Sequence, residues 1–183
     1  QEPRGDWSGA ETSYTRSLQV SEDLAERFGG PQELRDLSIS LDNVGRVQAA
    51  RGDWTGAETS YTRSLQVREH LAERVGGPQE LRDLSISVAN VGRVQEARGD
   101  WTGAETSYRR ALDVAERLVD EVVGGSSPEE FRQLRSRLEG IAARLAELKV
   151  DDARARALAL ARRIDVDTPL KNGASSGEVP VDP

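Results

Sequence analysis

Two kinds of polar residue recur along the chain at a fixed interval. Asn43 and Asn90 lie 47 residues apart, and Arg46 and Arg93 follow them at the same spacing. A carboxamide carries both a donor and an acceptor, so it can pair with a peptide group in either orientation. A guanidinium presents forked donors that match a carboxylate. The chemistry open to these positions is therefore recognition of a peptide backbone and of acidic side chains.

The sequence contains few residues that could carry out catalysis or bind a metal. There is no Cys to supply a thiol nucleophile, and the single histidine, His70, cannot build an imidazole metal cluster. Asp23 and Arg117 stand 47 residues to either side of His70, which indicates a solvated face. Carboxylates lie beside arginines in residues 22–27 and 68–74, where we expect spacings of three and four residues to stabilise helices. No phosphate loop or nucleophile motif occurs, so we expect no enzyme, no metal and no cofactor.

The composition narrows the class of protein further. The 183 residues are 36% hydrophobic and 31% charged, with a formal net charge of -7. A nucleic-acid binder would need a basic field, and a membrane span would need an apolar run of roughly 20 residues. We therefore expect a soluble, cytoplasmic chain that binds neither nucleic acid nor membrane. The excess of Arg over Lys suggests a bacterial coding sequence, and the start at Gln1 suggests a fragment or a processed product.

The interval of 47 residues belongs to a tandem repeat. The tetrapeptide Arg-Gly-Asp-Trp begins at residues 4, 51 and 98. Residues 4–50 and 51–97 are identical at 40 of 47 positions, which points to a recent or deliberate duplication. A third unit, residues 98–147, holds the pattern through Tyr108, then drifts and gains three residues around 124–128.

The end of the chain departs from the repeat. A degenerate cap extending to residue 164 would close the array, so we expect residues 1–164 to form one helical repeat domain. Residues 165–183 lack periodicity and are rich in Gly, Pro, Ser and Asp. We expect this segment to be a flexible or extended tail.

Each unit has the pattern of two helices. Leu34, Leu37, Leu41 and Val44 step by three and four residues, which predicts an amphipathic helix that we call helix A. A second run with the same period begins at Trp54 and predicts helix B. Short loops require neighbouring helices to be antiparallel. We expect seven helices, beginning with a helix B from about Trp7 to Phe28 and ending near Ile164.

Glycine, proline and aspartate mark the turns between these helices. Gly52 can take the left-handed conformation that ends helix A, and Asp53 can cap helix B. Gly76 and Gly77 end helix B, and Pro78 suits the first turn of the next helix A. The Arg-Gly-Asp tripeptides are therefore interpreted as turns and not as adhesion motifs. Trp7, Trp54 and Trp101 follow the capping position, and we expect each to pack on the neighbouring helix.

These residues resemble the signature of the tetratricopeptide-repeat family. The match comprises Leu41, Val44, Gly45, Gly52, Asp53, Trp54, Ala57, Tyr61 and Ser64, and it recurs 47 residues later. The unit is longer than the usual 34 residues and lacks the closing proline. In this it is similar to the longer repeats of kinesin light chains and of bacterial signalling proteins. The resemblance implies an all-α, right-handed solenoid of antiparallel helix pairs, in which Gly45 and Gly92 let helix A approach helix B closely.

The resemblance also implies a site. With Leu41, Val44 and Gly45 turned toward helix B, the helical period places a polar stripe on the opposite side of helix A. In the family this stripe lines the concave groove, and Asn43 and Asn90 match an asparagine ladder that holds a bound peptide. Gly140 and Ala143 stand at the corresponding positions of the last helix A, so the ladder should stop there. The candidate peptide-binding residues are Ile39, Asp42, Asn43, Arg46, Ile86, Asn90 and Arg93. The alternative is that they are solvated polar residues kept identical by duplication.

Three functions are open at this point. The first is a non-catalytic interaction module whose groove binds a peptide or helix of a protein partner, with acidic ligands matching Arg46 and Arg93. The second is a structural element that stacks end to end. Self-association would then use the first helix, where Ala10, Tyr14 and Leu18 should leave an apolar face exposed. The third is a sensor region that acts in cis within a larger signalling protein.

Overall fold

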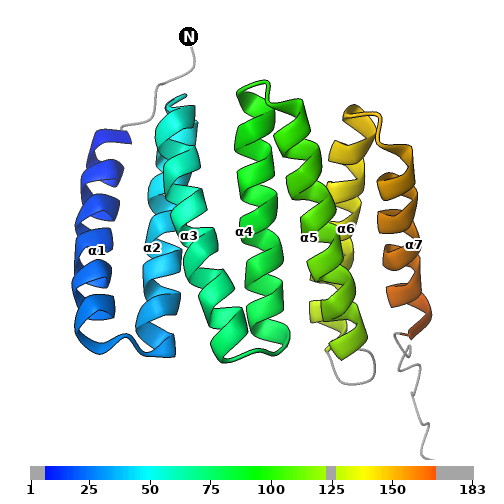
Figure 1. Cartoon of the computed structure of the whole chain (residues 1–183), viewed down its shortest axis with the longest axis horizontal. Helices are drawn as coiled ribbons and strands as arrows, with labels where there is room; N and C mark the ends of the chain where they lie inside the picture. Colours follow the sequence, from blue (N-terminus) through cyan, green and yellow to red (C-terminus); the bar gives the residue numbers. More distant parts are fainter. Residues whose placement is uncertain (1–6, 123–126, 168–183) are drawn as a thin grey trace, which may run out of the picture.

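A computed structural model describes residues 7–122 and 127–167, which form seven α-helices joined by short turns (Figure 1). The described residues contain no β-strand, so the predicted all-α class is confirmed. In chain order the helices are α1 (Trp7–Phe28), α2 (Pro31–Ala50), α3 (Trp54–Arg74), α4 (Pro78–Ala97), α5 (Trp101–Val122), α6 (Pro128–Glu147) and α7 (Asp151–Asp167). None of these helices is long and apolar enough to cross a membrane.

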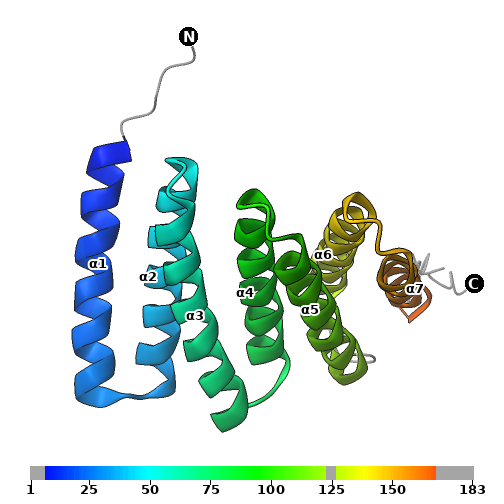
Figure 2. The same cartoon turned by 45° about the horizontal axis from the view of Figure 1, so that its top comes forward.

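Each helix packs chiefly on its neighbours in the chain, and the array runs in chain order from α1 at one end to α7 at the other (Figures 1 and 2). Ion pairs also join alternate helices, such as α1 to α3 and α2 to α4, so the helices form two layers. Helices α2, α4 and α6 are the predicted helices A, and α1, α3, α5 and α7 are the predicted helices B. The last helix extends to Asp167, three residues beyond the expected end at Ile164. The rest of the predicted tail, residues 168–183, lies outside the described residues.

The predicted turn residues adopt the expected geometry. Gly52 and Gly99 each have a φ of 80°, and each follows the end of a helix A. The Asp53 carboxylate accepts a hydrogen bond of 2.9 Å from the Gly56 amide, which caps α3. The second and third Arg-Gly-Asp tripeptides are therefore the turns between helices A and B. The first tripeptide, residues 4–6, lies outside the described residues.

Helix A and helix B of a unit approach each other at a glycine, as the sequence predicts. A Cβ atom built on Gly45 would lie 3.1 Å from the ring of Tyr61, and one on Gly92 would lie 3.1 Å from the ring of Tyr108. Ala57 and Ala104 are completely buried on the helix B side. Small residues on both helices thus allow each tyrosine ring to fill the contact between them.

The structure corrects one expectation about the charged residues. Asp23, His70 and Arg117 are all exposed, as predicted for a solvated face. However, two of the carboxylates in residues 22–27 and 68–74 pair with another helix and not with their own. Glu22 pairs with Arg63 of the next helix B, and Glu69 pairs with Arg110. These ion pairs therefore join successive repeat units, which sequence spacing within one helix could not reveal.

Candidate binding groove

Helices α2, α4 and α6 line two adjoining hollows. The first, of about 510 Å³, lies between α2 and α4, and its walls include Asn43, Arg46, Trp54, Asn90 and Arg93. The second, of about 490 Å³, lies between α4 and α6, and its walls include Ile86, Asn90, Arg93, Arg137, Gly140 and Arg144. Because Asn90 and Arg93 border both hollows, we treat the two as one surface and call it the A-face groove.

The structure brings most of the predicted site residues to this surface. Asp42, Asn43, Arg46, Ile86, Asn90 and Arg93 all border the A-face groove. Ile39 does not, because its side chain, 52% exposed, lies further along α2. Gly140 borders the groove on α6 without a side chain, so the pair of asparagines is not continued there. A role of these residues in binding stays a prediction.

The two predicted arginines have free donors. Arg46 donates from Nη2 to the Asn43 side-chain oxygen at 3.1 Å and to the Tyr14 hydroxyl at 3.4 Å, and its guanidinium lies 6.0 Å from the Tyr14 ring centroid. These contacts orient Arg46 without neutralising it. Arg93 makes no hydrogen bond or ion pair with a described residue. The first hollow therefore holds two cationic groups that lack a carboxylate partner in the described part of the chain.

Asp42 is committed to a contact within the protein. Its Oδ2 atom lies 2.7 Å from Nη2 of Arg68, a buried side chain on α3. Burial raises the pKa of the Asp42 carboxyl, while the Arg68 guanidinium acts in the opposite direction. We therefore regard Asp42 as a wall residue whose charge is already used, and not as a free group for a ligand.

The tryptophans differ from the prediction. The side chains of Trp54 and Trp101 are 38% and 59% exposed, so neither is packed away against the neighbouring helix. Both border a third hollow of about 290 Å³, next to the groove, together with Arg93 and Arg144. Each stands at the first position of a helix B, directly after the turn that precedes the helix. The side chain of Trp7 lies outside the described residues.

Two further arginines were missed from the sequence. Arg137 and Arg144 on α6 border the second hollow. Arg144 contacts Glu96 at 3.3 Å and Glu147 at 3.0 Å, whereas Arg137 has no ion pair with a described residue and burial lowers its pKa. Arg137 takes the position that Ser87 has on α4. Aligning helices α4 and α6 on their opening prolines would have revealed it.

The described residues offer no candidate metal centre. Within residues 7–122 and 127–167, no three or more His, Cys, Asp or Glu side chains cluster in a way that could hold a metal ion. The polar groups of the A-face groove are amides, guanidiniums, hydroxyls and one carboxylate that is already paired. Such groups suit hydrogen bonding and charge pairing with a polymer such as a peptide.

Similarity to known proteins agrees with this geometry. The family model described as tetratricopeptide repeat matches residues 40–75 and 87–120. Each match contains the end of a helix A, the turn and most of a helix B. No curated protein matches the chain.

Eighteen chains of solved structures match the fold. One is the crystal structure of BtubC (BKLC) from P. vanneervenii, with a TM-score of 0.63 and 18% sequence identity. The match covers 87% of this chain and 59% of that one, so this chain spans less than two thirds of the length of its structural neighbour. At this level of identity the likeness concerns the fold alone.

Proposed function

Because residues 40–75 and 87–120 match the tetratricopeptide-repeat family model, we propose that the chain is a protein-interaction module whose A-face groove binds an extended peptide. The observation that carries the proposal is the pairing of half-buried asparagines with uncompensated arginines along one surface. Asn43 and Arg46 contribute from α2, and Asn90 and Arg93 contribute from α4. The groove requires no chemistry beyond hydrogen bonds, charge pairs and apolar contact.

The ligand follows from the groups in the groove. Asn43 and Asn90 pair with peptide groups of the ligand backbone, which is independent of side-chain identity. Arg46 and Arg93 select acidic side chains, because a cation without an internal partner gains most from a carboxylate. Trp54 adds a flat apolar wall for an aliphatic or aromatic side chain. The preferred ligand is therefore an acidic peptide with at least one apolar residue.

The groove binds its ligand as a rigid, preformed surface. Helices α2 and α4 are each fixed at a close contact with the following helix B, through Gly45 with Tyr61 and Gly92 with Tyr108. Their groove-facing side chains are therefore held at a set separation before the ligand arrives. A preformed surface avoids part of the ordering cost of binding.

The test is selection from a random peptide library, followed by calorimetric titration of the selected peptides. Asn43→Ala with Asn90→Ala should weaken binding roughly 5- to 150-fold, since each hydrogen bond is worth about 0.5 to 1.5 kcal/mol. Arg46→Gln with Arg93→Gln should weaken the binding of acidic peptides and reduce its salt dependence. Arg117→Gln is the matched control, because it removes an exposed cation from α5, away from the groove.

The results of this test distinguish binding in the A-face groove from binding on another surface. Selected peptides that lack acidic residues, or that bind both double variants as tightly as the parent chain, would show that the A-face groove is not the binding surface. A loss of binding in the Arg117→Gln variant alone would move the site to the helix B side.

A further inference from the structure

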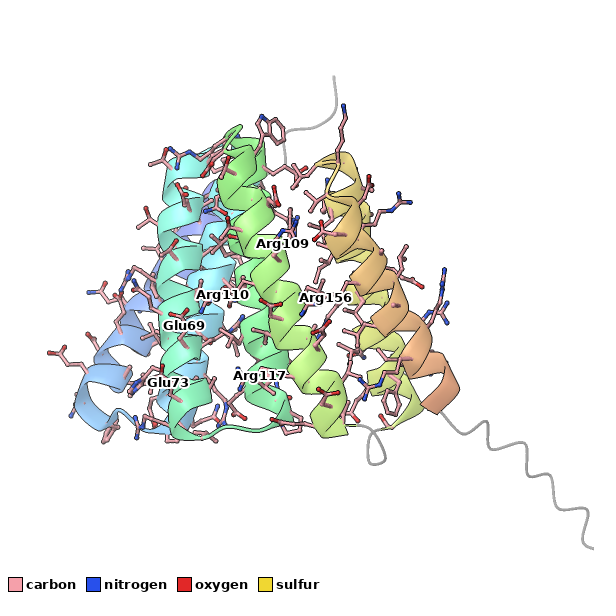
Figure 3. The ribbon with its side chains drawn as sticks, turned by 45° about the vertical axis from the view of Figure 1, so that its right-hand side comes forward. Glu69, Glu73, Arg109, Arg110, Arg117 and Arg156 are labelled. Carbon is pink, nitrogen blue, oxygen red and sulfur yellow. The ribbon has the colours of Figure 1, made fainter. Side chains whose placement is uncertain are left out.

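The ion pairs between repeat units recur at equivalent positions on the helices B. Glu22 of α1 lies 2.6 Å from Arg63 of α3, and Glu69 of α3 pairs with Arg110 of α5 in the same way. Figure 3 shows Glu69 and Arg110 facing each other across these two helices. Each pair joins residues 41 positions apart. One carboxylate and one arginine thus mark every described junction between these three helices.

A second set of ion pairs joins the helices A, with the order of charges reversed. Arg35 of α2 pairs with Glu80 of α4, and Arg82 of α4 lies 3.3 Å from Glu130 of α6. The Glu80 side chain is buried, so this contact forms part of the junction and not only of the surface. A unit that follows another therefore presents an arginine on helix B and a glutamate on helix A to the unit before it.

The outer side of α1 and α2 presents the same two groups without a partner among the described residues. Arg16 stands at the position of Arg63 and Arg110, and Glu33 stands at the position of Glu80. Neither Arg16 nor Glu33 makes a hydrogen bond or an ion pair with a described residue. Arg16 is on α1 and Glu33 is on α2. Helix α1 lies at one end of the array, where no described helix packs on its outer side (Figures 1 and 2).

The apolar side chains of α1 are exposed in the same region. Val20, Leu24 and Phe28 are 54%, 39% and 66% exposed. The equivalent side chains of α5, which has helices on both sides, are all buried: Val114, Leu118 and Val122. Tyr14 and Leu18 were predicted to be exposed, and both are half-buried. The side chain of Ala10 lies outside the described residues.

We propose that this α1 face receives a further repeat unit of the same kind. Its helix B carries a glutamate that meets Arg16, its helix A carries an arginine that meets Glu33, and its apolar stripe covers Leu24 and its neighbours. The charge pattern specifies this occupant, because the two described junctions already show how the same positions are filled. The far end of a second copy does not fit, since the described residues of α6 and α7 expose no large apolar side chain.

The experiment inserts a copy of residues 54–100 between Asp6 and Trp7. In the extended chain, Glu69 of the inserted copy should meet Arg16, and Arg82 of the copy should meet Glu33. We expect the helical circular dichroism to rise in proportion to length, and the amides of α1 to exchange more slowly with solvent. Both effects follow because a repeat is stabilised by its neighbours.

A matched pair of variants tests the charge pattern itself. In the parent chain, Arg16→Gln should leave the unfolding equilibrium unchanged, whereas Arg63→Gln should raise the unfolding constant about 1.5- to 5-fold. In the extended chain, both substitutions should have the same effect. The proposal would be overturned if Arg16→Gln left the unfolding equilibrium of a fully helical extended chain unchanged. An inserted unit that adds no helix would overturn it as well.

The parent chain gives an independent outcome. Sedimentation should show a monomer at micromolar concentration, because the α1 face is shaped for a repeat unit. A dimer that dissociates on Leu24→Arg would assign the face to a second copy and overturn the proposal.

Discussion

Arg68 on α3 reaches Asp42 on α2, with Nη2 and Oδ2 separated by 2.7 Å, and it also donates from Nη1 to the Ser87 hydroxyl on α4 at 2.6 Å. One buried guanidinium therefore joins three helices. The equivalent positions in the next unit hold Ala115 and Ala89. The helix pair α4–α5 therefore lacks both charges that the pair α2–α3 carries, which indicates that the two charges belong together.

Removing one end of this pair should cost more than removing both. Arg68→Ala or Asp42→Ala alone should destabilise the chain by about 1 to 3 kcal/mol, because the remaining charge is left in a buried site. The double variant should lie within about 1 kcal/mol of the parent chain, since the next unit already folds with alanine at both positions. Urea unfolding of the four chains gives the coupling directly. Additive effects of the two substitutions would contradict the assignment.

The sequence predicts those structural features that depend only on neighbouring residues. The φ angle of Gly52 and the cap at Asp53 depend on a few neighbouring residues, so helix boundaries could be placed with confidence in both full units. The helical period likewise placed Asn43 and Asn90 on one surface. These features need no knowledge of what lies in the next unit.

The errors concern contacts between distant residues. The partner of Asp42 is Arg68, 26 positions away on another helix, and no spacing rule within one helix identifies it. Trp54 was expected to pack because large aromatic residues usually do, but its side chain at the start of α3 is 38% exposed. Arg137 was missed because Ser40 and Ser87 stand at the equivalent positions of α2 and α4, so the repeat pattern does not mark this position as charged.

The close contact of helices A and B gives a second prediction. Gly45→Val and Gly92→Val should each destabilise the array by roughly 1 to 3 kcal/mol, since the added methyl groups must displace the Tyr61 or Tyr108 ring. Gly140 is the control, because no atom lies within 4 Å of a Cβ placed there. Gly140→Ala should be stabilising by about 0.5 to 1 kcal/mol through helix propensity alone. Equal thermal shifts at the three glycines would refute the contact.

The exposed tryptophans give a third prediction. Trp54→Ala and Trp101→Ala should each cost about 1 kcal/mol or less, well below the 3 to 5 kcal/mol typical of a buried aromatic residue. Acrylamide should quench the tryptophan fluorescence efficiently, and a bound groove peptide should protect Trp54. A loss of several kcal/mol on Trp54→Ala would restore the packing role predicted from the sequence.

The last prediction concerns the junction between α5 and α7. Arg109 donates to both carboxylate oxygens of Asp152, at 2.7 and 2.9 Å (Arg109 is labelled in Figure 3). Hydrogen bonds from Arg109 lower the pKa of Asp152 from 3.8 to about 2. Because the folded pKa lies below the unfolded one, this contact stabilises the fold above pH 3.8 and is lost as the pH falls toward 2.

Carbon-13 NMR of the Asp152 carboxyl group provides the measurement. The parent chain should titrate near pH 2, and Arg109→Gln should return the midpoint toward 3.8, because the hydrogen bonds to the charged form are removed. Arg109→Lys should give an intermediate value, since an ammonium keeps the charge but loses the two parallel hydrogen bonds. A midpoint near 3.8 in the parent chain would mean that Arg109 and Asp152 are not held together in solution, and that α7 is joined to α5 by its apolar contacts and the remaining ion pairs.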